Sequence, residues 1–121
     1  MAVPLRVVDS ITEAVGDGAG AVVVSGSHGG VSAARFAIQA GVRLAVFNDA
    51  GVGRDGAGIA GLALLQAAGI AACTVSHDSA RIGEARSTLD DGVISHANPR
   101  AEALGARAGV RLHTWLESLP D

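Results

Sequence analysis

The sequence of 121 residues contains no lysine and no tyrosine, and its three aromatic residues are Phe36, Phe47 and Trp115. Its nine basic residues are therefore all arginines, scattered along a chain whose net charge is −3. Nucleic-acid binding requires a clustered basic surface, and binding of single strands also uses aromatic side chains on which bases stack. The composition argues against a nucleic-acid-binding protein.

Cysteine is also scarce, because Cys73 is the single one in the chain. No disulfide can form within the chain, which is typical of cytoplasmic proteins. Cys73 falls inside an apolar run, which predicts a small buried side chain rather than a reactive thiol. Residues 1–6 lack the basic and apolar regions of a secretory signal peptide. We expect a cytoplasmic protein.

One long stretch, Gly56 to Ser76, contains no charged residue. Its length would suffice for a membrane span. However, it contains four glycines and the polar residues Gln66 and Thr74, and Gly69 divides it into a helix-like half and a strand-like half. We expect a helix, a turn and a strand here, and no membrane partner.

Aliphatic residues and glycine are abundant, since 49% of the chain is hydrophobic and 17 residues are glycine. This composition fits strands that are buried on both faces. The length predicts a single domain over residues 1–121. The mean hydropathy of +0.37 is high for a small soluble monomer, so we expect a homo-oligomer.

The connections into the predicted strands share one form, a helix end followed by glycine and a β-branched residue. They occur at Gly41-Val42, Gly69-Ile70, Gly92-Val93 and Gly109-Val110. Glycine just past a helix end accepts the left-handed conformation, and Val or Ile then opens an extended segment. Helical spacing predicts helices over 32–40, 57–68, 84–91 and 99–104.

This alternation of helices and strands predicts an α/β fold, a small three-layer Rossmann-like domain with a mostly parallel sheet of four or five strands. We expect residues 5–8 to form a further strand that leads into a short turn; the alternative is an amphipathic helix over residues 8–15. Residues 110–112 form either a last strand or a tail that Trp115 packs over the sheet.

Three apolar runs stop at the same dipeptide, Ser-His, at residues 27–28, 76–77 and 95–96. A fourth run, residues 44–47, stops at Asn48-Asp49. The carboxyl ends of parallel strands share one edge of a sheet, and ligands bind in the crevice there. We therefore expect these reactive side chains to form a ligand-binding site.

The first group of site residues is a glycine-rich turn between a strand and a helix. Backbone amides at a helix start, here at Gly29 and Gly30, bind anions. Ser25 and Ser27 would add hydroxyl donors, and His28 would exchange a proton. The turn matches neither a P-loop nor the dinucleotide fingerprint. The alternative is a tight turn of small residues with a capping serine.

The second group follows the next strand. Asp49 would orient a histidine or act as a base, and Asn48 beside it would bind substrate. Arg54 would clamp a carboxylate or phosphate. In the alternative, Arg54 is solvated and Asp55 caps the following helix.

The third group contains the preferred general acid–base, His77, since imidazole side chains titrate near neutral pH. Arg81 would hold an anionic group or tie its loop to Asp49. Asp78 is expected to cap a turn. His96 is a further candidate for proton transfer.

These groups predict a cofactor-independent enzyme that acts on a small anionic metabolite, a carboxylate or an amide, by histidine general acid–base chemistry; hydrolase, lyase and isomerase remain open. The alternative is a non-catalytic anion-binding protein or accessory subunit. No local metal-ligand pattern is present, so a divalent metal is the less favoured reading. The predicted catalytic residues are His77, His28, Asp49 and His96, and the predicted substrate-binding residues are Ser25, Ser27, Gly29, Gly30, Asn48, Arg54 and Arg81.

Overall fold

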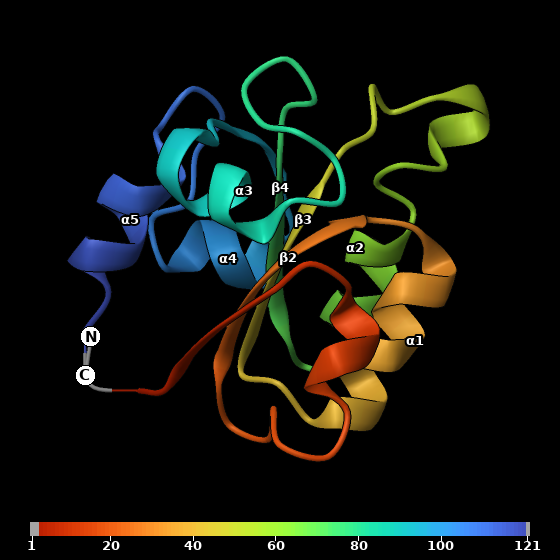
Figure 1. Cartoon of the computed structure of the whole chain (residues 1–121), viewed down its shortest axis with the longest axis vertical. Helices are drawn as coiled ribbons and strands as arrows, with labels where there is room; N and C mark the ends of the chain where they lie inside the picture. The colour runs from red at the N-terminus through yellow and green to blue at the C-terminus, as the bar shows by residue number, and fades with distance from the viewer. Residues whose placement is uncertain (1–2, 121) are drawn as a thin grey trace.

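The computed structural model describes residues 3–120, which form a five-stranded sheet between two helical layers (Figure 1). The strands are β1 (Leu5–Val8), β2 (Val22–His28), β3 (Leu44–Asn48), β4 (Ala71–Val75) and β5 (Ile94–Ala97). They lie side by side in chain order; β1 to β4 are parallel and β5 is antiparallel to β4. The predicted fold class, a small mostly parallel Rossmann-like α/β domain, is confirmed.

The helices divide between the two faces of the sheet. One face carries the 3-10 helix η1 (Ile11–Ala14), α1 (Val31–Ala40) and α2 (Gly61–Ala67). The other carries α3 (Ala85–Asp91), α4 (Pro99–Ala103) and α5 (Leu112–Ser118). A second 3-10 turn, η2 (Arg54–Gly56), lies in the loop between β3 and α2. Figure 1 shows the sheet nearly edge-on between these layers.

Because helices cover both faces, successive strand residues enter two different cores. Val23 and Phe47 pack with α1 and α2, whereas Val24 and Val46 pack with α3 and α5. Burial on both faces explains why the strands are unbroken aliphatic runs rather than alternating apolar and polar residues.

The expectation that the third Ser-His pair ends a parallel strand is wrong. β5 runs antiparallel to β4, with His96 opposite Thr74 and Ile94 opposite Val75. The reason lies in the connection: the Ser76 amide donates to the Val93 carbonyl at 2.9 Å, so the chain returns to the edge that it left. A strand that starts at the carboxyl edge must run back across the sheet. Ser95 therefore stays close to that edge, at the start of its strand.

Glycine plays the expected role at two helix ends but not at a third. Gly41 and Gly69 adopt φ values of 69° and 78°, the left-handed conformation that glycine favours. Gly92 has φ of −62°, so the predicted left-handed cap is absent there. Instead, a Cβ at Gly92 would lie 2.3 Å from the Thr88 carbonyl oxygen. Glycine is required at this position for close packing.

Two helix boundaries also differ from those predicted. The helix predicted over 57–68 begins only at Gly61, because the Gly58 amide donates to Val52 and the Gly61 amide donates to Gly29, which holds the preceding turn outside the helix. The last strand predicted over 110–112 is present only as an isolated antiparallel bridge between Arg111 and Val93, and α5 begins at Leu112. Trp115 is buried, and its indole N–H donates to the Leu104 carbonyl.

The charge-free stretch is resolved as predicted, into turns, the short helix α2 and the strand β4. Over residues 3–120, no helix has both the length and the hydropathy to cross a bilayer.

Candidate functional site

The candidate site lies where the chain leaves β4 and crosses the carboxyl edge of the sheet to reach α3, which covers the face opposite α1 and α2. Three hydrogen bonds hold this crossing segment over the ends of the neighbouring strands. Asn48 Nδ2 donates to the Ala80 carbonyl at 3.1 Å, the Gly83 amide donates to the Gly26 carbonyl at 2.7 Å, and the Ala85 amide donates to Asp9 Oδ1 at 2.9 Å. In Figure 1 the loops after β3 and β4 extend from the same end of the sheet.

Gly26 allows the crossing segment to approach β2 this closely. A Cβ at Gly26 would lie 2.5 Å from the Glu84 amide nitrogen and 2.8 Å from the Asp9 carbonyl oxygen, both backbone atoms. A side chain at this position would push the segment away from the sheet.

An open pocket of about 530 Å³ lies under the crossing segment. Two predicted site residues, His77 and Arg81, line it together with Asp78. The remaining lining residues are Ala50, Ser79, Ala80, Ile82, Ser87 and Asp91. The structure therefore brings one predicted acid–base residue and one predicted anion-binding residue to the same cavity.

Asp49 and His77 form the best-defined pair of the site. Asp49 is 4% exposed, and its Oδ1 accepts the backbone amides of Gly51 at 2.8 Å and of His77 at 3.0 Å. Oδ1 also lies 3.4 Å from Nδ1 of the His77 imidazole, whose side chain is 53% exposed. A buried carboxylate thus faces one ring nitrogen while the rest of the ring reaches the pocket.

The surroundings of Asp49 keep it ionised. Burial raises the pKa of Asp49, but hydrogen bonds from the Gly51 amide, the Ser95 hydroxyl and the His77 amide, with the charge on His77, together lower it below the ordinary value of 3.8. The carboxylate can therefore orient the imidazole at neutral pH.

A pair of hydroxyls lies behind this carboxylate, and sequence reasoning did not find it. The hydroxyls of Ser95 and Thr74 lie 2.9 Å apart across β4 and β5. The Ser95 hydroxyl oxygen also lies 3.4 Å from the Thr74 carbonyl oxygen, so its single proton can be donated either there or to Asp49. These contacts fix Ser95 beside Asp49. The signal was present, since Ser95 precedes His96, but the strand direction was needed to place it.

The outer nitrogen of His77 has its own neighbour. Nε2 lies 3.2 Å from Oδ1 of Asp78, whose side chain is 86% exposed. The sequence predicted that Asp78 caps a turn; its carboxylate instead lies beside the ring of His77. The contact forms because the chain turns immediately after β4, which brings adjacent side chains together as an extended strand would not.

The loop that supports His77 has an unusual backbone. Ala50 and Val52 adopt positive φ values of 52° and 67°, and Gly51 between them has φ of 77°. Positive φ is strained for alanine and more so for a β-branched residue. A Cβ at Gly51 would lie 3.6 Å from the His77 ring. The strained loop therefore forms part of the surface on which the imidazole rests.

The two serines of the glycine-rich turn serve the fold. Ser25 is fully buried and donates its hydroxyl to the Val46 carbonyl at 2.9 Å. The Ser27 hydroxyl accepts the Ile11 amide at 3.0 Å and so joins β2 to η1. The predicted use of Ser25 as a hydroxyl donor to substrate is wrong, because its proton is committed inside the core.

The glycines of the same turn are closely packed. The Gly29 amide donates to the Asn48 carbonyl at 3.0 Å, so it does not face a ligand. Gly30 is the N-cap of α1. His28 is exposed on the α1 side, with Nε2 of its ring 2.9 Å from where a Cβ at Gly30 would lie. His28 borders a separate small pocket of about 150 Å³ and not the pocket of His77.

The remaining predicted binding residues have different positions. Asn48 is fully buried and anchors the loops on both sides, since its Oδ1 accepts the Ala50 amide at 2.8 Å. Arg54 is exposed on η2. The Arg81 guanidinium lies 3.9 Å from the Glu84 carboxylate, and the Arg81 side chain is 82% exposed. Arg81 therefore does not tie its loop to Asp49.

His96 lies inside β5 and is half-buried, with a buried Nδ1 that has no hydrogen-bond partner among residues 3–120. Across the part of the chain that the structure describes, no three His, Cys, Asp or Glu side chains are grouped closely enough to hold a metal ion. The absence of a cofactor stays a prediction.

Asp9, a residue that sequence reasoning missed, is as important to the site as Asn48 because it holds the start of α3. Its signal was the one that identified Asp49, a carboxylate directly after an apolar strand.

Comparison of the chain with protein families, characterised proteins and solved structures finds no match.

Proposed function

We propose that this protein is an enzyme in which His77 performs general acid–base chemistry on a small anionic substrate, a carboxylate or an amide, without a cofactor. The observation that carries the proposal is the contact between the buried, ionised Asp49 and Nδ1 of a half-exposed His77 at the border of a pocket. Buried carboxylates that orient an imidazole in this way are a recurring feature of proton-transfer sites.

Asp49 determines which ring nitrogen is the base. A carboxylate beside Nδ1 holds the imidazole proton there, so the lone pair of the neutral ring is on Nε2. Nε2 is the nitrogen that faces away from Asp49, next to Asp78. Because Asp78 is largely exposed, it can rotate into solvent when a substrate takes its place beside Nε2.

Arg81 supplies the positive charge of the same pocket. Its contact with Glu84 is long, and both side chains are largely exposed. Exposed ion pairs of this kind contribute little to stability. A substrate carboxylate can therefore replace Glu84 and bind the guanidinium with two parallel hydrogen bonds.

Hydrolysis, elimination and isomerisation all need a positioned base and a cation for the substrate charge, and the pocket supplies both. Amide hydrolysis would use Nε2 to deprotonate water. Elimination or isomerisation would use it to remove a proton next to a carbonyl group.

The test is proton NMR of the purified protein in D2O with a panel of small carboxylates and amides. Hydrolysis produces new signals, while proton abstraction replaces a substrate proton with deuterium. We expect at least one member to react, and His77→Gln to lower its rate by about 100-fold or more. The matched control is His113→Gln, because His113 is 55% exposed and lies 3.3 Å from Glu117 on α5.

Undiminished turnover in His77→Gln would refute the proposal. Binding of a panel member with no reaction in the wild type would favour the alternative, a non-catalytic anion-binding protein or accessory subunit.

We also propose that the protein is a cytoplasmic homo-oligomer. Large apolar side chains remain exposed on the surface, among them Ile82, which is 55% exposed and lines the pocket of His77. A second copy that covered Ile82 would shield the pocket from water. Light scattering coupled to size-exclusion chromatography would show a mass of at least two chains, and Ile82→Gln would reduce it.

A further inference from the structure

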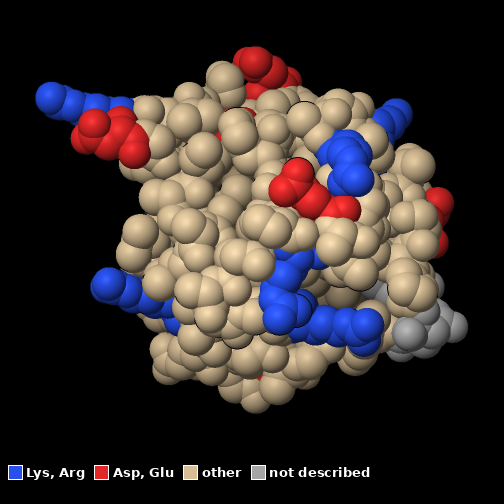
Figure 2. Space-filling view, turned by 180° about the vertical axis from the view of Figure 1, so that it is seen from behind, with Lys and Arg blue, Asp and Glu red and all other residues tan. Residues whose placement is uncertain are grey.

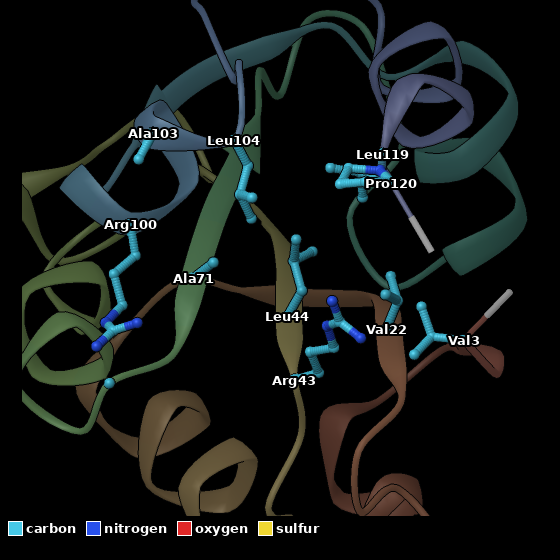
Figure 3. A pocket seen from close by; sticks show the side chains of 11 residues that line it. Val3, Val22, Arg43, Leu44, Ala71, Arg100, Ala103, Leu104, Leu119 and Pro120 are labelled. Carbon is cyan, nitrogen blue, oxygen red and sulfur yellow. The ribbon is translucent and has the colours of Figure 1, made fainter. Parts of the chain in front are cut away.

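A second and more enclosed cavity, of about 350 Å³, lies at the opposite edge of the sheet, where the parallel strands begin (Figure 3). The first described residues of the chain and the last ones meet there, since Val3 and Pro120 both line it.

Most of this lining is apolar. Val22, Leu44 and Ala71 come from the starts of three adjacent strands, and all three are buried members of the core. Leu104 and Leu119 close the cavity from α4 and from the end of α5, as Figure 3 shows. Ligand sites for small molecules typically have this size and this predominance of apolar side chains.

The charged residues of the lining are two arginines, Arg43 from the turn before β3 and Arg100 from α4 (Figure 3). Within residues 3–120, no carboxylate lies within ion-pair distance of either guanidinium. Arg100 passes close to Gly69, since a Cβ at Gly69 would be in ordinary van der Waals contact with its Nη2 atom, at 3.6 Å. In Figure 2 arginine side chains are spread over the whole view, and those just below its centre form a continuous patch.

This charge distribution differs from that of the whole chain, whose net charge is −3. Among residues 3–120, the lining combines two guanidinium groups and an apolar wall with no acidic side chain, which is complementary to a molecule that combines an anionic group with an apolar body. The part of the lining that the structure describes contains no histidine, cysteine, hydroxyl or carboxylate side chain, and its polar side chains are the two arginines.

We propose that this cavity is a second ligand site, which binds an organic carboxylate with an apolar chain. Arg43 and Arg100, which Figure 3 shows on opposite sides of Ala71, attract the carboxylate to the cavity, and the chain lies against Leu44, Leu104 and Leu119. The site is independent of the proposed enzyme function, because it lies at the opposite edge of the sheet and shares no residue with the pocket of His77.

The test is isothermal titration of the full chain with octanoate, with 1-octanol and acetate as probes of the apolar and anionic parts alone. We expect saturable binding of octanoate and much weaker binding of the other two. Arg43→Gln and Arg100→Gln should each weaken octanoate binding by about tenfold or more. Arg35→Gln is the matched control, since Arg35 is an exposed arginine on α1, on the other face of the sheet.

A second variant tests the shape of the cavity. Ala103 is exposed on α4 at its border, so Ala103→Leu keeps a good helix former while it narrows the opening. We expect it to weaken octanoate binding with no loss of thermal stability. The proposal would be overturned by an absence of octanoate binding, by octanol binding as tightly as octanoate, or by Arg43→Gln and Arg100→Gln variants that bind octanoate like the wild type.

Discussion

The Oδ1 atom of Asp49 makes two different contacts with His77: it accepts the backbone amide at 3.0 Å and lies 3.4 Å from Nδ1 of the ring. One carboxylate oxygen thus fixes both the main chain and the side chain of the same residue. Because Asp49 directly follows β3 and His77 follows β4, the contact also joins the loops of two adjacent parallel strands.

Removal of the Asp49 side chain should destabilise the fold, because the Gly51 and His77 amides lose their acceptor. Both hydrogen bonds are only part-buried, so water can partly replace the lost acceptor, and Asp49→Ala should lower the free energy of unfolding by about 1–3 kcal/mol. Asp49→Asn keeps an oxygen in place and should cost less. Urea unfolding measures both variants, and equal losses would show that these two hydrogen bonds do not matter.

The lowered pKa of Asp49 predicts a loss of stability in acid. The unfolded carboxyl has the ordinary pKa of 3.8 and the folded one a lower pKa, so the stabilisation is complete above the unfolded value and is lost as pH falls through the folded value. Urea midpoints measured across this acidic range should decline with a slope that Asp49→Asn reduces. Asp90→Asn, which removes an exposed partner of Arg86, should leave the slope unchanged. A slope that is the same in Asp49→Asn and the wild type would contradict this account.

Cys73 should react with thiol reagents only when the protein unfolds. The side chain is fully buried, and burial raises the pKa of its thiol to about 12, which leaves almost no thiolate. Because the chain has a single cysteine, labelling with iodoacetamide followed by mass spectrometry reports on this site alone. Rapid labelling of the native protein, faster than its unfolding, would be inconsistent with the structure.

Gly26→Ala should loosen the crossing segment above the pocket. The added methyl group would overlap backbone atoms of Gly83 and Glu84, so either β2 or the segment must move. We expect a loss of at least about 2 kcal/mol in the free energy of unfolding. Gly20→Ala is the control: it has a positive φ but no atom within 4 Å, so it should cost about 1 kcal/mol from backbone strain alone. A Gly26→Ala protein no less stable than Gly20→Ala would argue against the tight crossing.

The sequence predicted the strands and the carboxyl edge because aliphatic runs and terminal polar residues are local patterns. It could not predict the direction of β5, since that depends on where the connection after β4 ends. The same limitation affected Ser95, which lies beside Asp49 only because β5 runs backwards.

The same limit of local sequence patterns separates the site residues that could be predicted from those that could not. Asp49 and His77 could be found from strand ends alone. Ser25 and Asn48 occupy equivalent sequence positions, but their side chains turn into the core, where Val46 and Ala80 carbonyls accept their hydrogen bonds. Whether a polar side chain at a strand end faces a ligand or the core depends on strand register and bulges, and β2 has such an irregularity between Val24 and His28.

The most direct test of the central claim is nitrogen NMR of the histidine rings at alkaline pH, where imidazole is neutral, in the wild type and in Asp78→Ala. The account predicts that the proton of neutral His77 resides on Nδ1, facing Asp49, and that it resides on Nε2 in His113, where Glu117 is the neighbour. A His77 ring protonated on Nε2 in both proteins would contradict the assignment of that nitrogen as the base.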